Sequence, residues 1–192
     1  MARTKEFDPD AVLQRAMELF WQKGYEATSM ADLVEHLGIG RASIYATFGG
    51  KRELYLKAYD RYLENGPDLF GPLSQPGPAL PAVRALVERY AREAAQDTLR
   101  RGCFVVNTAV ELAPHDRTVA QRIEANWNFL EAALTSALTR ARAQGELGAE
   151  RDPRALARFL LTLLQGMRVI GKSSHDPARL RDTAEQALSL LC

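Results

Sequence analysis

The chain has 192 residues, of which 46% are hydrophobic and 26% charged, and its formal net charge is +1. This balance excludes a disordered chain and gives no global basic charge for nucleic acid. The sequence shows neither a secretion signal nor an apolar run long enough to span a bilayer, so we expect a cytoplasmic protein without membrane contact.

Helical signals begin near the N-terminus. Asp8-Pro9-Asp10 predicts a helix start, because aspartate caps a helix and proline suits its first position. Apolar residues then recur at helical spacing until Gly24 ends the pattern. Ser29 and Asp32 have the spacing of a capping box, which predicts a second helix that Gly38 closes.

Two further helices are expected at residues 41–48 and from Lys51 to about Glu64. No segment of the chain alternates polar and apolar residues as a half-buried strand would, so we predict an all-α fold. A dinucleotide-binding loop needs a strand before its glycines, whereas here a helix precedes Gly38-Ile39-Gly40. We therefore interpret these glycines as the turn of a helix-turn-helix, whose second helix enters the major groove of DNA.

Residues 7–64 resemble the DNA-binding domain of the TetR family of bacterial transcriptional repressors. The segment "LFWQKGYEATSMADLVEHLGIGRASIYATFGGKRELY" carries the resemblance, and Gly40 departs from it where a serine or threonine often opens the recognition helix. The matching positions are Phe20, Gly24, Tyr25, Thr28, Ile39, Tyr45, Phe48, Lys51 and Leu54. The resemblance implies a homodimer on a palindromic double-stranded DNA operator, released by a small-molecule effector.

Charge concentrates in this segment, where residues 40–57 carry four Lys or Arg against Glu53 alone. Such cations contact phosphates and set affinity, while contacts to base edges set sequence preference. We expect Arg41 to read guanine and the small Ala42 and Ser43 to approach base edges. The expected phosphate contacts come from Tyr45, Thr47 and Lys51, from Thr28 or Ser29 unless these only cap the helix, and from an N-terminal arm with Arg3 and Lys5.

Composition changes after Glu64, because residues 65–81 hold five prolines and three glycines. This segment is expected to be a loop between a DNA-binding domain at residues 1–64 and a helical effector-binding and dimerisation domain at residues 82–192. Helical patterns resume in this second domain at residues 82–99, 103–113, 116–144, 153–170 and 177 to the C-terminus.

Two apolar stripes at the C-terminal end predict the dimer interface, because relatives in the family pair through their last two helices. The same stripes could instead pack only on their own domain. The residues are Leu156, Phe159, Leu160, Leu163, Leu164 and Met167 in the first stripe, and Leu180, Ala184, Ala187, Leu188 and Leu191 in the second.

The middle helices combine rings with polar groups, which suits a ligand pocket, although aromatic residues at helical spacing more often form core. The expected effector-binding residues are Cys103, Phe104, Asn107, Glu111 and Trp127, with Asn126 and Phe129 beside them.

Cys103 also supports an alternative, a repressor that senses oxidants or electrophiles. It follows Arg100, Arg101 and Gly102 at a predicted helix start, where dipole and cations favour a thiolate, although free cysteine is commonly core. Metal and catalytic chemistry are not expected: the two cysteines and three histidines show no ligand spacing, and no nucleophile lies in a recognisable motif. We predict neither a cofactor nor an enzyme.

Overall fold

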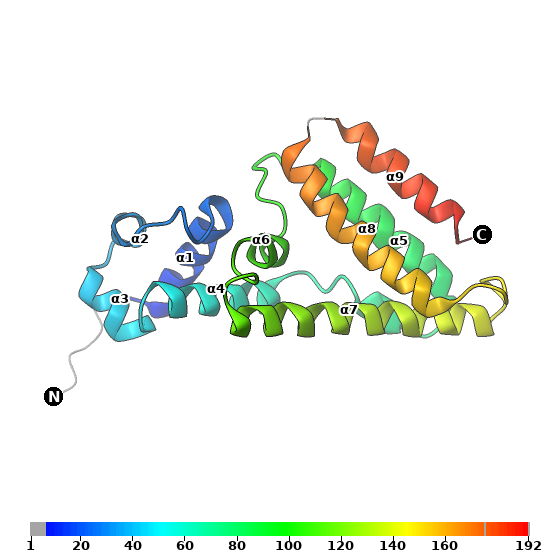
Figure 1. Cartoon of the computed structure of the whole chain (residues 1–192), viewed down its shortest axis with the longest axis horizontal. Helices are drawn as coiled ribbons and strands as arrows, with labels where there is room; N and C mark the ends of the chain where they lie inside the picture. Colours follow the sequence, from blue (N-terminus) through cyan, green and yellow to red (C-terminus); the bar gives the residue numbers. More distant parts are fainter. Residues whose placement is uncertain (1–6, 175, 192) are drawn as a thin grey trace.

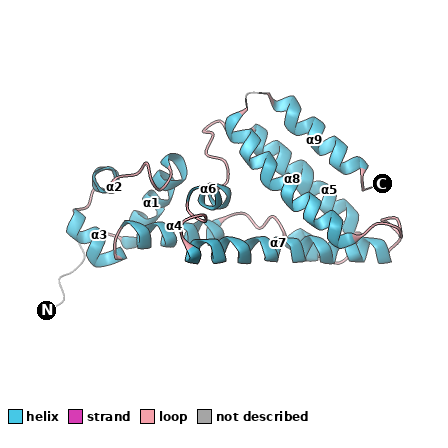
Figure 2. Cartoon of the chain, viewed as in Figure 1, coloured by secondary structure: helices cyan, strands magenta, loops and turns pink. Residues whose placement is uncertain are grey.

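The computed structural model describes residues 7–174 and 176–191, and over these residues it is all-α, as predicted (Figures 1 and 2). The helices are α1 (Pro9–Lys23), α2 (Met30–Leu37), α3 (Arg41–Phe48), α4 (Lys51–Asn65), a 3-10 helix η1 (Gly71–Ser74), α5 (Ala79–Ala95), α6 (Phe104–Glu111), α7 (Arg117–Ala143), α8 (Pro153–Ser173) and α9 (Pro177–Ser189).

Local side-chain caps begin several helices where the sequence predicts them. Asp8, Asp152 and Asp176 each accept a hydrogen bond from the backbone N–H two residues later, and a proline follows each of them. Ser29 and Asp32 form the predicted reciprocal capping box of α2. These starts were predictable because every group involved lies within one helical turn.

The start of α5 differs from the expected residue 82. It begins at Ala79, because the Glu146 carboxylate accepts the N–H groups of Ala79 and Leu80 at 2.9 and 2.8 Å. Glu146 lies more than sixty residues away in sequence, so no local signal marks this cap. The helix also ends at Ala95 rather than Leu99.

Helices α1–α4 share a hydrophobic cluster with residues from far along the chain. Phe104, Leu112 and Ile123, from α6 and α7 and the turn between them, complete this N-terminal cluster. The residues that α1–α4 contribute to the cluster include Val12, Phe20, Leu33, Ile44, Phe48, Leu54, Tyr55 and Tyr59. Helices α1–α4 therefore share their core with α6 and the start of α7.

A second cluster, the C-terminal cluster, lies between η1, α5, α7, α8 and α9. It is built mainly from leucine and alanine, with Leu134, Leu138, Leu160 and Leu164 fully buried. The 27-residue helix α7 contributes to both clusters: Val119 and Ile123 belong to the first, and Leu130 to Ala141 to the second. Figure 1 shows α7 running along the lower side of the molecule, with α6 beside it, between α1–α4 and α8.

Candidate functional site

Helix α3, the expected recognition helix, is positioned by its two apolar residues. Ile44 and Phe48 are buried in the N-terminal cluster, which leaves the opposite face of α3 in solvent. That exposed face carries Arg41, Ala42, Tyr45 and Ala46, while Ser43 and Thr47 are half-buried on its flanks. The structure thus brings the predicted DNA contacts on α3 together. Ala46 was not among them, although its spacing of four residues from Ala42 indicates the same face.

Glycines bound α3 on both sides. Gly38 adopts the left-handed conformation with φ of 66°, and Gly49 does so after α3 with φ of 95°. Gly50 follows with φ of 137°, and a Cβ there would lie 3.3 Å from the ring of Tyr45. The glycines therefore allow the tight turns that leave Tyr45 exposed beside the start of α4.

Cations and rings pair on this surface. The Arg41 guanidinium lies 5.8 Å from the Tyr45 ring centre, and the Lys51 ammonium lies 4.2 Å from that of Tyr25. Each contact fixes the position of its cation against a ring.

Thr28 does not fit the predicted phosphate contact. Its side chain is fully buried, and its hydroxyl donates to the Gly24 carbonyl oxygen at 2.6 Å. Its role is to close the turn between α1 and α2. Ser29 is exposed, but its hydroxyl is used by the capping box with Asp32.

Lys23 extends the capping network, since its ammonium lies 2.7 Å from the Asp32 carboxylate. Hydrogen bonds from Lys23 and then from Ser29 hold the pKa of Asp32 well below its usual value. The carboxylate at the start of α2 therefore stays ionised. Arg3 and Lys5, the predicted N-terminal arm, lie outside the described residues.

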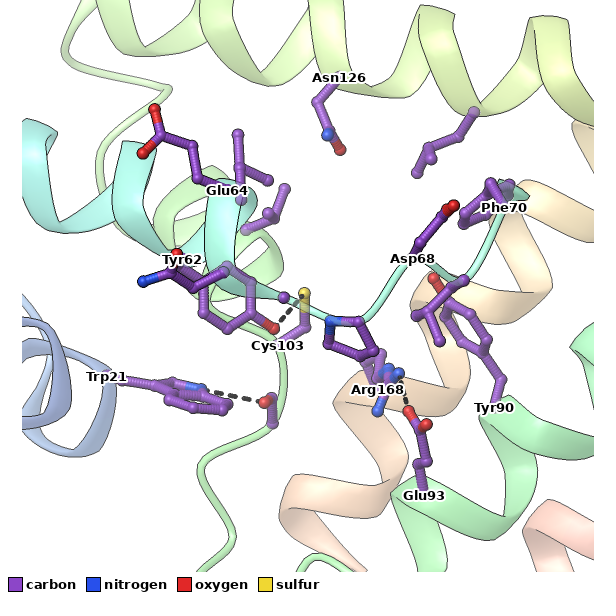
Figure 3. A pocket seen from close by; sticks show the side chains of 18 of the residues that line it. Trp21, Tyr62, Glu64, Asp68, Phe70, Tyr90, Glu93, Cys103, Asn126 and Arg168 are labelled. Carbon is purple, nitrogen blue, oxygen red and sulfur yellow. Dashed lines mark hydrogen bonds and ion pairs between the residues drawn. The ribbon is translucent and has the colours of Figure 1, made fainter. Parts of the chain in front are cut away.

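A cavity of about 700 Å³ lies where the N-terminal bundle meets the C-terminal helices (Figure 3). Its walls come from α1, the end of α4 and the loop after it, α5, the start of α6, α7 and α8. The lining combines aromatic rings with polar and acidic side chains such as Glu64 and Asp68, and Figure 3 shows Trp21 and Tyr62 on one side and Phe70 and Tyr90 on the other. The cavity therefore has walls in both halves of the chain.

One ion pair lines the cavity, where Arg168 donates to Glu93 at 2.7 Å and its guanidinium lies over the ring of Tyr90 (Figure 3). Burial alone would raise the pKa of Glu93, but hydrogen bonds from Arg89 and Arg168 outweigh it and the pKa is lowered. The pair therefore stays charged on both sides, and each charge neutralises the other. Gln165 also lines the cavity, with its amide nitrogen buried and without a hydrogen-bond partner among the described residues.

Cys103 lies in the cavity wall, as the predicted ligand contact requires. Its sulfur accepts a hydrogen bond from the Tyr62 hydroxyl at 3.7 Å, and the thiol is half-buried at the N-cap of α6. Burial, followed by the neighbouring thiol, raises the pKa of Tyr62 above its usual value, so this phenol remains a hydrogen-bond donor. Asn126 and Phe129 line the same cavity from α7.

Four predicted effector residues lie elsewhere. Phe104 is fully buried and packs edge to face against Tyr55, so it is core. Asn107 is occupied by hydrogen bonds with the Arg101 carbonyl and with Lys172, and Trp127 packs against the N-terminal cluster. Glu111 accepts two backbone hydrogen bonds from the turn after α1. None of the four is among the lining residues of the cavity, and this corrects the expectation for them.

The two C-terminal stripes divide between the core and the surface. Leu160, Leu164 and Met167 of the first are buried in the C-terminal cluster, as are Leu180, Ala184, Ala187 and Leu191 of the second. The outer face instead shows Phe159 and Leu190, which are 40% and 41% exposed. These two residues and Leu163 line a shallow groove of about 440 Å³ between α8 and α9.

Comparisons with known proteins agree with this arrangement. Residues 12–58 match a family model described as bacterial regulatory proteins of the tetR family, and residues 79–187 match the tetracyclin repressor-like C-terminal domain. The uncharacterised HTH-type regulator YezE of Bacillus subtilis (strain 168) is 39% identical over 100% of both chains. The HTH-type transcriptional repressor ComR of Escherichia coli (strain K12) is 34% identical over 98% of this chain and 90% of its own.

Among solved structures, a cysteine-substituted variant of the TetR family regulator CifR is 32% identical, with a TM-score of 0.85 and full coverage of both chains. That structure is a complex with 26-base-pair double-stranded operator DNA. Over the described residues of the present chain, no helix is long and apolar enough to cross a membrane. These relatives are transcriptional regulators and not enzymes, so the prediction that this chain is a regulator and not an enzyme is confirmed. The chain belongs to the TetR family of bacterial transcriptional regulators.

Proposed function

We propose that this regulator is a repressor that binds a near-palindromic operator as a homodimer and leaves it when a small molecule fills the cavity. The observation that carries the proposal is the composition of the cavity wall. Met17 and Trp21 come from α1 of the DNA-binding helices, whereas Arg168 comes from α8. A ligand that contacts both sides favours one relative orientation of the two halves, which is the requirement for a population shift.

The DNA side of the proposal rests on the exposed face of α3. We expect Arg41 to read guanine, and the methyl groups of Ala42 and Ala46 suit contact with thymine. The expected phosphate contacts come from Tyr45, Thr47, Lys51 and the start of α2. The repressor ComR and the operator-bound CifR support this role, which also implies that the protein works in the cytoplasm.

The proposed dimer uses the outer face of α8 and α9. A helix-turn-helix protein reaches two half-sites with two copies, and a symmetric pair buries the same patch on both. Phe159, Leu163 and Leu190 supply the apolar centre of such a patch.

The lining of the cavity indicates the chemistry of the effector. Arg168 is paired with Glu93, but Glu64 and Asp68 add two further carboxylates to a wall that also holds rings and aliphatic groups. An anionic ligand would lose hydration and meet these carboxylates, whereas a cationic group could pair with them. We therefore expect an uncharged or cationic, largely apolar molecule with a polar group that hydrogen-bonds the Gln165 amide.

Selection of bound fragments from the source genome tests the proposal. Wild type is expected to retain near-palindromic fragments with half-sites about one helical turn apart or slightly more. Lys51→Ala should weaken binding to all retained fragments alike. It should also reduce the slope of log affinity against log salt concentration by about one, the contribution of one phosphate contact. A screen of uncharged and cationic aromatic compounds for operator release then tests the effector. Retention of no fragment by wild type would contradict the DNA-binding role.

The position of Cys103 favours the second candidate, in which thiol modification causes release. Its sulfur lies in the cavity wall, within hydrogen-bond reach of the Tyr62 hydroxyl. The comparison is operator release by mild peroxide or a quinone from wild type and from Cys103→Ser. Release from wild type alone supports the thiol trigger, whereas equal responses leave the non-covalent effector.

A further inference from the structure

Glu111 joins the end of α6 to the turn that follows α1. Its Oε2 accepts the N–H of Tyr25 at 2.9 Å, and its Oε1 accepts the N–H of Glu26 at 2.8 Å. Gly24 makes this approach possible: its φ is +88°, and a Cβ there would lie 3.1 Å from both carboxylate oxygens. The turn is therefore shaped to receive a carboxylate from a helix that lies 85 residues away in sequence.

Helix α6 connects this contact to the cavity. Cys103 at its N-cap and Val105 in its first turn line the cavity. One turn before Glu111, the buried Thr108 hydroxyl lies 2.8 Å from the Tyr55 hydroxyl. At eight residues, α6 is about 12 Å long and too short to bend between its ends. A displacement of its first turn therefore moves Glu111 as well.

The turn held by Glu111 is part of the DNA-binding arrangement. The Tyr25 ring lies under the Lys51 ammonium, and the Tyr25 carbonyl accepts the Thr28 N–H that precedes the start of α2. Moving this turn shifts Lys51 and the first residues of α2 together. Glu111 thus acts on the DNA-binding surface without lying on it.

We propose that Glu111 is the positioning residue that transmits occupancy of the cavity to the DNA-binding helices. The proposal rests on the proposed ligand-responsive function and assigns its transmission to one carboxylate. Glu111 contacts neither the cavity nor the exposed face of α3. Its role is to make the orientation of the turn at residues 24–26 depend on the position of α6.

A double-mutant cycle on a selected operator fragment tests this assignment without a known effector. Cys103→Phe places a ring in the cavity and stands in for a bound ligand. Glu111→Gln keeps the size of the side chain but offers an N–H₂ group where one backbone N–H needs an acceptor. Exposed Glu124→Gln on α7 removes the same charge and is the matched control for general electrostatics.

We expect Cys103→Phe to weaken operator binding by about tenfold and Glu111→Gln by about threefold to tenfold, with an unchanged salt slope. The double variant should bind at least about threefold tighter than the product of the two single effects predicts. A double variant that matches the product overturns the proposal. So does a Cys103→Phe variant with wild-type affinity, because a filled cavity would then leave the DNA-binding helices unmoved.

Amide hydrogen exchange gives a second readout at the residues concerned. The N–H groups of Tyr25 and Glu26 should exchange faster in Glu111→Gln and in Cys103→Phe, while the N–H of Leu33 in α2 keeps its wild-type rate. Unchanged exchange at Tyr25 and Glu26 in Cys103→Phe would show that the signal does not pass through Glu111. Failure of wild type to bind any fragment would instead contradict the proposed function.

Discussion

The two hydrophobic clusters are built from different side chains. The N-terminal cluster is rich in rings, and Phe20, Tyr55 and Phe104 meet edge to face with centroids 4.9 and 5.2 Å apart. The C-terminal cluster consists mainly of leucine and alanine on long helices. Ring pairs of this kind have a preferred geometry, whereas aliphatic packing depends chiefly on volume.

Hydrogen bonds between distant segments occur around both clusters. Around the N-terminal cluster, the Trp21 indole donates to the Gly102 carbonyl at 3.0 Å and Arg52 pairs with Asp116 at 2.8 Å. Around the C-terminal cluster, Glu146 and Arg140 bind backbone groups near helix ends. The two clusters therefore differ in their core contacts: rings with a preferred geometry position the DNA-binding helices, whereas aliphatic packing fills the C-terminal scaffold, which polar contacts such as Arg168–Glu93 also join.

The largest expected effect concerns the outer face of the C-terminal scaffold. Leu163→Glu should cost about 3–5 kcal/mol of dimerisation free energy, because it places an unpaired charge in the proposed interface. Light scattering should then report monomers, and operator binding should be lost with the dimer. Leu99→Glu, at a leucine that is 57% exposed beyond the end of α5, is the control. A folded Leu163→Glu dimer would place the interface elsewhere.

Leu134→Ala tests the C-terminal cluster itself. The side chain is fully buried, so the change should cost about 2–5 kcal/mol of unfolding free energy. Because this substitution changes only the volume of an aliphatic core, the operator sequence preference should not change. Denaturant unfolding and fragment selection measure the two quantities, and an altered preference would contradict the division between clusters.

Arg41→Ala tests the DNA-reading surface. It should cost about 1–3 kcal/mol of operator binding free energy and relax the preference at one base position per half-site. Exposed Arg117→Ala, at the start of α7, removes the same charge as a control. Unchanged specificity in Arg41→Ala, measured by fragment selection, would remove Arg41 from base reading.

Tyr55→Phe tests the directional contacts of the N-terminal cluster. It removes the hydrogen bond to Thr108 at a loss of about 1 kcal/mol, since the Thr108 hydroxyl keeps its bond to the Phe104 carbonyl. We expect weaker operator binding despite this small loss of stability. Arg140→Met, which removes a hydrogen bond to the Leu73 carbonyl in the C-terminal half, is the comparison and should leave operator affinity unaltered. Equal effects of the two substitutions on operator affinity would remove the distinction between the clusters.

The smallest expected effect is on acid stability. Hydrogen bonds from the Val119 backbone and then from Arg52 lower the pKa of Asp116, the N-cap of α7. A lowered pKa stabilises the folded state fully above the ordinary aspartate value of 3.8, and the contribution is lost as the pH falls below it. Asp116→Asn keeps the cap but not the charge. Its melting temperature should therefore approach that of wild type as the pH falls through this range.

Sequence reasoning succeeded where neighbours in the chain decide the structure. The caps at Asp8, Ser29, Asp152 and Asp176 and the bounds of α3 are local, and so were predictable. The exposed face of α3 follows from the same periodicity, because Ile44 and Phe48 fix its buried side.

Sequence reasoning failed where distant segments decide. Phe104 and Glu111 have the chemistry of ligand contacts, but Tyr55 buries the ring and the turn after α1 occupies the carboxylate. The start of α5 depends on Glu146 in the same way. A threonine at position 28 could contact a DNA phosphate or bind a nearby backbone group, and the sequence does not distinguish these roles. The hydrogen bond from its hydroxyl to the Gly24 carbonyl decides for the second.

The shared N-terminal cluster limits how this protein can be divided or recombined. A fragment that ends in the proline-rich loop would lack Phe104, Leu112, Val119 and Ile123, and so would expose the apolar surface that they cover. A chimaera that exchanges only residues 1–64 would place a foreign core against these four side chains. Exchange of DNA specificity between relatives should therefore transfer α6 and the first two turns of α7 together with α1–α4. The segments that build the DNA-binding half are thus not contiguous in the sequence.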